Sequence, residues 1–182
     1  MPINAKTVLA IIPARGGSRR TPNKNLAPYR GIPLIQHAIN HAKASRYIDT
    51  IAISSDSDTI LAFATPPILQ LLRPPFLASS QASSEAVIAH ALYSLPHHDY
   101  VVLLQPTSPN RTAADIDSCL EIAEHHHGRA ISVNETGSRN GAVYVAKTEL
   151  FLETLSLDST GTVFIMPDSR SLDIDYPEDF GK

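Results

Sequence analysis

The stretch IIPARGGSRRTPNKN, residues 11–25, follows directly on an apolar run and decides how the chain is expected to fold. Its two adjacent glycines give the backbone freedom, and four basic residues give it positive charge: Arg15, Arg19, Arg20 and Lys24. A buried strand that ends in a flexible basic loop is typical of α/β proteins. In these proteins ligands bind beyond the carboxyl ends of parallel strands.

The rest of the chain repeats this alternation of short apolar runs and helical patterns. Most of the runs are unbroken, which is typical of strands covered on both faces of a sheet. The expected strands are 8–12, 50–54, 68–72, 100–104, 130–133, 142–146 and 162–166. The expected helices are 33–45, 57–64, 84–95, 112–128 and 147–155. We therefore expect an α/β fold, a Rossmann-like, doubly wound and mostly parallel sheet in a single domain over residues 1–182.

Composition limits the functions that are compatible with this fold. The chain has 182 residues and a formal net charge of −3, which argues against a general binder of nucleic acid or of membrane surfaces. Its one cysteine, Cys119, cannot form an internal disulfide and is expected in the core. The chain start lacks a signal-peptide pattern and no apolar run approaches about 18 residues, so we expect a cytoplasmic protein.

The first loop is suited to a polyphosphate. Backbone N–H groups of Gly16, Gly17 and Ser18 can surround an anion, and the basic side chains around them add charge. The spacing matches neither the P-loop nor the dinucleotide-binding glycine pattern. A solvated basic turn is the simpler alternative.

Two later segments complete a candidate site. LLQPTSPNR, residues 103–111, is a proline-stiffened polar loop after another buried strand, which suits substrate recognition. Asp173 and Asp175 stand two apart in an extended segment and so point the same way. Two carboxylates beside a polyphosphate suit Mg²⁺, although the same segment also reads as the start of a helix at Tyr176 and Pro177.

Six segments together resemble the CMP-N-acylneuraminate cytidylyltransferase family, which activates sialic acid and related 2-keto sugar acids. They are IIPARGGSRRTPNKN (11–25), ISSDSDTI (53–60), LLRPPFLASSQASS (71–84), LLQPTSPNR (103–111), NGAVYVAK (140–147) and DIDYPEDF (173–180). The resemblance runs from about Leu9 to Phe180. It implies a nucleotidyltransferase fold, and attack of the anomeric hydroxyl of a nonulosonic acid on the α-phosphate of CTP with release of pyrophosphate.

The resemblance also implies roles for individual residues. The triphosphate contacts are Arg15, Lys24 and Asn25, with Gly16, Gly17 and Ser18 forming the loop at the nucleotide. Arg73 and Ser84 match positions that hold the cytidine, and Gln105 and Tyr144 match sugar-acid contacts, with Asn140 beside the same pocket. Asp173 and Asp175 match the carboxylates that bind Mg²⁺. The catalytic set is thus Arg15, Lys24, Asp173 and Asp175, and the general base stays unassigned.

The sequence departs from the usual family pattern at several points. Arg19 and Arg20 replace a Lys-Gly pair, Ser80 replaces an acid, and Asn110 replaces a Leu. Only residues 136–139 stand where the family usually has a few dozen residues that form the dimer contact. The sequence therefore predicts a tight turn at Gly137, a more open acceptor site, and a monomer or an atypical homodimer.

Two other functions remain compatible with the sequence. One keeps the reaction but changes the acceptor, for example to the sugar acid Kdo. The other is a non-catalytic nucleotide-binding module. Asp56 could help to order the nucleotide loops, but a role as the N-cap of the following helix is sufficient to explain it.

Overall fold

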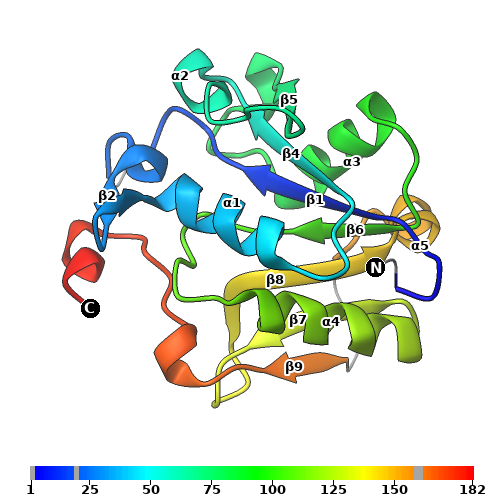
Figure 1. Cartoon of the computed structure of the whole chain (residues 1–182). Helices are drawn as coiled ribbons and strands as arrows, with labels where there is room; N and C mark the ends of the chain where they lie inside the picture. Colours follow the sequence, from blue (N-terminus) through cyan, green and yellow to red (C-terminus); the bar gives the residue numbers. More distant parts are fainter. Residues whose placement is uncertain (1–2, 19–20, 158–161) are drawn as a thin grey trace.

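The computed structural model describes residues 3–18, 21–157 and 162–182. A seven-stranded sheet with the order β5-β4-β1-β6-β8-β7-β9 forms its centre (Figure 1). Its strands are β1 (Val8–Pro13), β4 (Thr50–Ser55), β5 (Leu69–Leu72), β6 (Tyr100–Leu103), β7 (Arg129–Val133), β8 (Arg139–Lys147) and β9 (Val163–Ile165). The seven expected strands all form, and the largest difference is that β8 begins at Arg139 instead of Ala142. The α/β prediction is confirmed.

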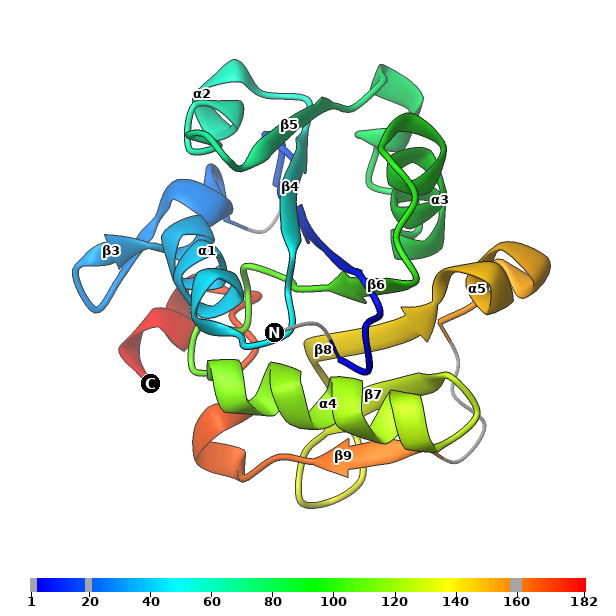
Figure 2. The same ribbon diagram turned by 45° about the vertical axis from the view of Figure 1, so that its right-hand side comes forward.

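Helices cover both faces of the sheet, as the unbroken apolar runs predict. They are α1 (Leu34–Ala44), α2 (Asp58–Leu61), α3 (Ser84–Ser94), α4 (Ala113–His125) and α5 (Thr148–Thr154). Figure 2 shows α3 and α5 on the side of the sheet opposite α1. Alternate β1 residues accordingly enter different cores: Ala10 packs with α1 and α4, whereas Ile11 packs with α3 and α5. The expected core residue Cys119 is fully buried in the first of these.

The direction of β8 differs from that expected in a sheet built only from parallel β-α-β units. It pairs antiparallel with both β6 and β7, whereas β1 pairs parallel with β4 and β6. The connection from β7 to β8 is a tight turn in which Gly137 N donates to Asn134 O at 2.9 Å and Gly137 has φ +82°. The predicted turn is confirmed. Because β8 is antiparallel, its first residues lie beyond the carboxyl end of β6.

Local capping agrees with the sequence at α4 and differs at α2. Thr112 and Asp115 form the expected capping box at the start of α4. The N-cap of α2 is Ser57, so the reading of Asp56 as the helix cap is wrong.

The C-terminal segment returns across the molecule to the first loop. Figure 1 shows it running from β9 to the side of α1 and of the small sheet formed by β2 (Pro28–Tyr29) and β3 (Ile32–Pro33). Ile174 is fully buried against Tyr29 and Leu34. This packing brings Asp173 and Asp175 to the edge of the sheet where β1 and β6 end.

Candidate active site

A cleft of about 790 Å³ lies beyond the carboxyl ends of β1, β5 and β6. Its volume is that of a typical small-molecule site, and its place is where a doubly wound sheet binds ligands. Nine of the predicted site residues line it: Arg15, Ser18, Lys24, Asn25, Arg73, Ser84, Gln105, Asp173 and Asp175. Four do not belong to the lining: Gly16, Gly17, Asn140 and Tyr144.

The first loop is held by an aspartate from the end of β4. Gly16 N donates to Asp56 Oδ1 at 2.8 Å, so this N–H is already occupied by a carboxylate. A Cβ at Gly16 would lie 3.0 Å from Ser57 Cβ, which explains why the position favours glycine. Of the two readings of Asp56, the structure therefore supports the one in which it orders the loop. Arg19 and Arg20 lie outside the described residues.

Asn25 and Lys24 enter the cleft from a short 3₁₀ helix, Lys24–Leu26. Asn25 is buried, and its Nδ2 donates to Arg15 O at 3.0 Å, which fixes the backbone that carries the Arg15 side chain. Lys24 Nζ lies 2.9 Å from Asp175 Oδ1, and the Lys24 side chain is only 13% exposed. The predicted triphosphate contacts and the predicted metal carboxylates therefore meet in one cleft.

The two carboxylates lie in different electrostatic environments. Burial raises the pKa of the Asp173 carboxyl, and the charge of Asp175 adds to this effect. A hydrogen bond from Thr107 and the charge of Lys24 act in the opposite direction. A partly desolvated carboxylate next to a second one is stabilised by a cation, and Lys24 supplies that charge here.

The backbone on either side of the carboxylates is fixed. Ile174 N donates to Thr107 O at 2.8 Å, and Asp179 Oδ2 accepts from the backbone N–H groups of Asp175 and Tyr176 at 3.0 and 2.9 Å. The Lys182 ammonium and these N–H groups lower the pKa of Asp179 to about 2. The 3₁₀ helix Pro177–Gly181 follows, so the predicted helix start and the two carboxylates that line the cleft are both present.

The donor set fits a hard divalent cation that also contacts a ligand. Among residues 3–18, 21–157 and 162–182, no group of three or more His, Cys, Asp or Glu side chains could hold a metal ion. Two carboxylates leave several coordination positions to water and substrate phosphate. Mg²⁺ characteristically binds in this way at phosphoryl-transfer sites.

Arg73 and Ser84 form the opposite wall of the cleft. Arg73 is 5% exposed and donates from Nη2 to Ser54 O at 2.8 Å, and burial lowers its pKa to about 10. Ser84 opens α3, whose N-cap is Ser83. Residues 79–83 also line this wall. The sequence marks them by their run of small polar residues, but alone gave no reason to place them beside Arg73.

The predicted acceptor side lies at the end of β6. Gln105 lines the cleft, and a Cβ at Gly141 would lie 2.8 Å from Gln105 Oε1 and 3.6 Å from Asp173 Oδ2. Gly141, at φ +71°, thus allows Gln105 to lie against β8. Tyr144 is half-buried on β8, and burial raises its pKa.

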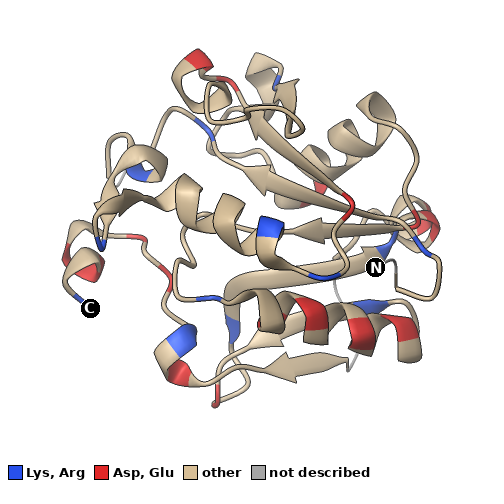
Figure 3. Ribbon diagram, in the orientation of Figure 1, with Lys and Arg blue, Asp and Glu red and all other residues tan. Residues whose placement is uncertain are grey.

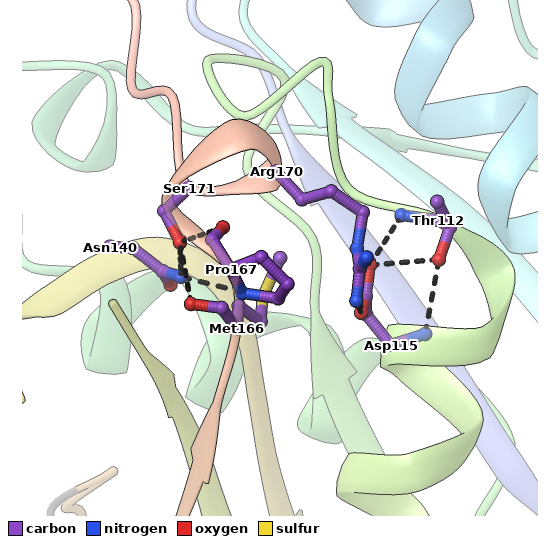
Figure 4. A network of polar contacts seen from close by, with 7 residues as sticks. All are labelled: Thr112, Asp115, Asn140, Met166, Pro167, Arg170 and Ser171. Carbon is purple, nitrogen blue, oxygen red and sulfur yellow. Dashed lines mark hydrogen bonds and ion pairs between the residues drawn. The ribbon is translucent and has the colours of Figure 1, made fainter. Parts of the chain in front are cut away.

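Asn140 is a buried residue whose amide is fully engaged. Its Oδ1 accepts from Ser132 Oγ at 2.6 Å and from Ala142 N at 3.2 Å. Its Nδ2 donates to Ser171 Oγ at 3.0 Å and to Met166 Sδ at 3.3 Å (Figure 4). A ligand could reach this amide only by displacing one of these bonds.

The α/β fold and the cleft beyond the carboxyl ends of its strands agree with the comparison with known families. A family model described as Cytidylyltransferase matches residues 9–148, and the chain belongs to that family. Among curated proteins, an N-acylneuraminate cytidylyltransferase of Escherichia coli O18:K1:H7 is 29% identical over 95% of this chain and 50% of its own length. A CMP-N,N'-diacetyllegionaminic acid synthase of Legionella pneumophila is 28% identical over 95% of this chain and 93% of its own length. The chain thus spans about half of the first relative and nearly all of the second.

Solved structures agree with this fold at low sequence identity. A CMP:2-keto-3-deoxy-manno-octonic acid synthetase complexed with CTP has a TM-score of 0.76 and 13% identity, over 94% of each chain. Rv0371c from Mycobacterium tuberculosis H37Rv has a TM-score of 0.75 and 16% identity, over 98% of this chain and 97% of its own. Among the described residues, helices that are both apolar and long enough to cross a membrane do not occur.

Proposed function

We propose that the chain transfers CMP from CTP to the anomeric hydroxyl of a nonulosonic, sialic-acid-like 2-keto sugar acid and releases pyrophosphate. The observation that carries the proposal is the meeting of Arg15 and Lys24 with the paired carboxylates Asp173 and Asp175 in one cleft. Family membership and the names of the relatives support CTP as the nucleotide and a 2-keto sugar acid as the acceptor.

In the proposed reaction the hydroxyl oxygen of the acceptor forms a bond to the α-phosphorus of CTP. The bond from that phosphorus to the bridging oxygen breaks, pyrophosphate leaves with the electron pair, and the proton of the hydroxyl passes to solvent. In the proposal Arg15 and Lys24, which line the cleft, bind the triphosphate and offset the charge that develops on the leaving group. The chain thus contributes mainly orientation and charge neutralisation.

Mg²⁺ is part of the proposal, with Asp173 and Asp175 as its protein ligands. When held by these two carboxylates, the ion would supply charge neutralisation for the phosphates and would make the acceptor hydroxyl easier to deprotonate. The Lys24 ammonium, now paired with Asp175, would move to a phosphate oxygen when the nucleotide and metal enter.

Recognition of the two substrates is assigned to opposite walls of the cleft. Arg73, Ser84 and the 79–83 loop are proposed to hold the cytidine, and Gln105 the sugar acid. Tyr144 stays a proposed acceptor contact, although it does not belong to the lining of the cleft. Figure 3 shows Lys and Arg interspersed with Asp and Glu along the ribbon. This mixture of charges is compatible with small-molecule substrates, which do not require a broad basic face as nucleic acid does.

The short β7–β8 turn supports a trimmed form of the enzyme. The alignment with the Escherichia coli relative extends over 210 residues, more than this whole chain, so that relative contains residues absent here. We propose a monomer or an atypical homodimer with an open acceptor side, located in the cytoplasm. Sedimentation of the purified protein with and without CTP would distinguish the two oligomeric states.

An acceptor of the Kdo type is a second candidate. An 8-amino-3,8-dideoxy-manno-octulosonate cytidylyltransferase of Shewanella frigidimarina is 31% identical over 66% of this chain, and the solved CTP complex mentioned above is a Kdo-type synthetase.

The deciding experiment is pyrophosphate release from CTP and Mg²⁺ with sialic, legionaminic, pseudaminic and Kdo acids in parallel. Release with one of the first three supports the proposal, and release with Kdo alone supports the second candidate. The double variant Asp173→Asn/Asp175→Asn is the control and should be inactive while remaining folded. A protein that binds CTP but releases no pyrophosphate with any acid would favour the non-catalytic module.

A further inference from the structure

We propose that three successive residues, Ser169, Arg170 and Ser171, form a mount that positions the carboxylates of Asp173 and Asp175. Each of the three is held by a different part of the chain, and the carboxylates follow within four residues. The inference rests on the proposed metal-dependent transfer, because that reaction is what requires the carboxylates to be placed accurately. The side chains that hold the mount are therefore positioning residues and need not touch the substrate.

The central attachment is the ion pair of Arg170 with Asp115. Arg170 Nη2 lies 2.9 Å from Asp115 Oδ1, and its Nε lies 3.2 and 3.1 Å from the two carboxylate oxygens. The Asp115 side chain is 1% exposed and also accepts from Thr112 N and Oγ1, both at 2.8 Å, as the α4 capping box (Figure 4). The Arg170 guanidinium thus binds the Asp115 carboxylate through two nitrogens, and this carboxylate is itself fixed at the start of α4.

The second attachment is the amide of Asn140. Its Nδ2 donates to Ser171 Oγ at 3.0 Å, and that hydroxyl donates in turn to Pro167 O at 3.0 Å (Figure 4). Because Asn140 Oδ1 is held by Ser132 of β7, the mount is joined to the two strands β7 and β8. In this arrangement the amide of Asn140 holds Ser171 in place. This role differs from the predicted contact with the sugar acid.

The third attachment is the side-chain amide of Asn110. Asn110 Nδ2 donates to Ser169 O at 3.2 Å, and Asn110 Oδ1 accepts from Tyr29 OH at 3.1 Å. An apolar side chain at this position could make neither bond. In this chain the polar residue therefore joins the mount to the loop after β6 and to β2.

The mount is close enough to control the carboxylates. Since an extended chain advances at most about 3.6 Å per residue, Asp173 lies within roughly 7 Å of chain from Ser171. The next fixed point is the hydrogen bond from Ile174 N to Thr107 O at 2.8 Å. Mg²⁺ demands nearly ideal octahedral geometry, so release of one end of so short a segment should weaken metal binding.

The test is binding of Mn²⁺ alone, without nucleotide, followed by electron paramagnetic resonance. We expect Arg170→Met and Ser171→Ala each to weaken Mn²⁺ binding by roughly tenfold, the low end of what loss of an outer-shell partner costs a metal site. Arg170→Lys keeps the charge without the planar fork and should give a smaller loss. The matched control is Arg46→Met, because Arg46 also pairs with a buried aspartate of α4, Asp117, at 3.0 Å.

Two further measurements separate failure of the mount from failure of the proposed function. If wild type and Asp173→Asn/Asp175→Asn bind Mn²⁺ equally, the proposed metal site is wrong. The mount is then judged by hydrogen exchange of the Ile174 amide, which needs no metal. Faster exchange in Arg170→Met and Ser171→Ala than in Arg46→Met supports the mount. Exchange and Mn²⁺ affinity equal to those of the control would overturn it.

Discussion

The ammonium of Lys24 lies 2.9 Å from Oδ1 of Asp175, across 151 residues of sequence. Lys24 is expected to bind a phosphate and Asp175 a metal ion. In the structure, the two side chains bind each other instead. The pair keeps two neighbouring carboxylates compensated before substrates arrive, at a site where burial already raises the pKa of Asp173. In the proposed reaction, binding of nucleotide and metal separates this pair.

Lys24→Met should therefore change metal binding and turnover in opposite directions. Without the ammonium, the two carboxylates attract a divalent cation more strongly, so Mn²⁺ alone should bind more tightly. Turnover with CTP should fall by about 10²- to 10³-fold, because a charge that stabilises the leaving phosphates is lost. Paramagnetic resonance and pyrophosphate release measure the two effects. Weaker Mn²⁺ binding in this variant would show that Lys24 does not compete with the metal.

The bond from Gly16 N to Asp56 predicts a second effect on the nucleotide. Asp56→Ala should raise the KM for CTP by about tenfold, because the loop that carries Arg15 loses a hydrogen bond worth about 1 to 2 kcal/mol. Asp56→Asn keeps an acceptor oxygen and removes a negative charge, so its KM should stay near that of the wild type. Asp58→Ala, at the exposed start of α2, is the control. A raised KM in Asp56→Asn would mean that the charge is needed, and not the hydrogen bond.

The sequence predicted the strands of this fold well because their signal is local. Unbroken apolar runs such as 100–104 identify a strand covered on both faces, and the loops that follow such strands in a parallel sheet meet at one edge. The direction of β8 was not predictable, since periodicity is the same whichever way a strand runs.

The contacts that tie the site together were also hidden from the sequence. Asp56 and Gly16 are 40 residues apart, and Arg170 and Asp115 are 55 apart, so no local pattern marks either pair. Asn140 is an example of a residue that a sequence motif singles out without revealing its contacts. Its position in the NGAVYVAK motif led to the prediction that it is a site residue, but its burial and its engaged amide appear only in the folded chain.

Two glycines with similar positive φ angles offer a test of the acceptor side. Gly141 and Gly137 have φ values of +71° and +82°, so alanine at either position should destabilise the fold by about 1 to 2 kcal/mol. A Cβ at Gly141 would lie 2.8 Å from Gln105 Oε1, whereas one at Gly137 would meet no described atom within 4 Å. Gly141→Ala alone should raise the KM for the sugar acid, with the KM for CTP unchanged. Equal KM values for the acid in the two variants would remove Gln105 from the proposed acceptor site.

His41 on α1 predicts how stability depends on pH. Burial, together with the positive charges of Arg111 and His37, lowers its pKa from 6.5 to about 4, although Asp115 acts in the opposite direction. Its Nδ1 is buried without a hydrogen-bond partner among the described residues. Between about pH 6.5 and pH 4 the unfolded chain therefore binds a proton at this residue that the folded chain does not. Stability should rise with pH across this window and fall as the pH is lowered.

The change attributable to His41 should be on the order of 3 kcal/mol over the whole window, since each pKa unit corresponds to about 1.4 kcal/mol. Urea denaturation at several pH values measures it. His41→Gln should flatten the free energy of unfolding between pH 6.5 and pH 4, because glutamine does not titrate. His127→Gln, which alters an exposed histidine after α4, should keep the wild-type slope. If His41→Gln retained that slope, the acid sensitivity would have to come from another group, and the buried imidazole would be protonated in the folded protein as readily as in the unfolded chain.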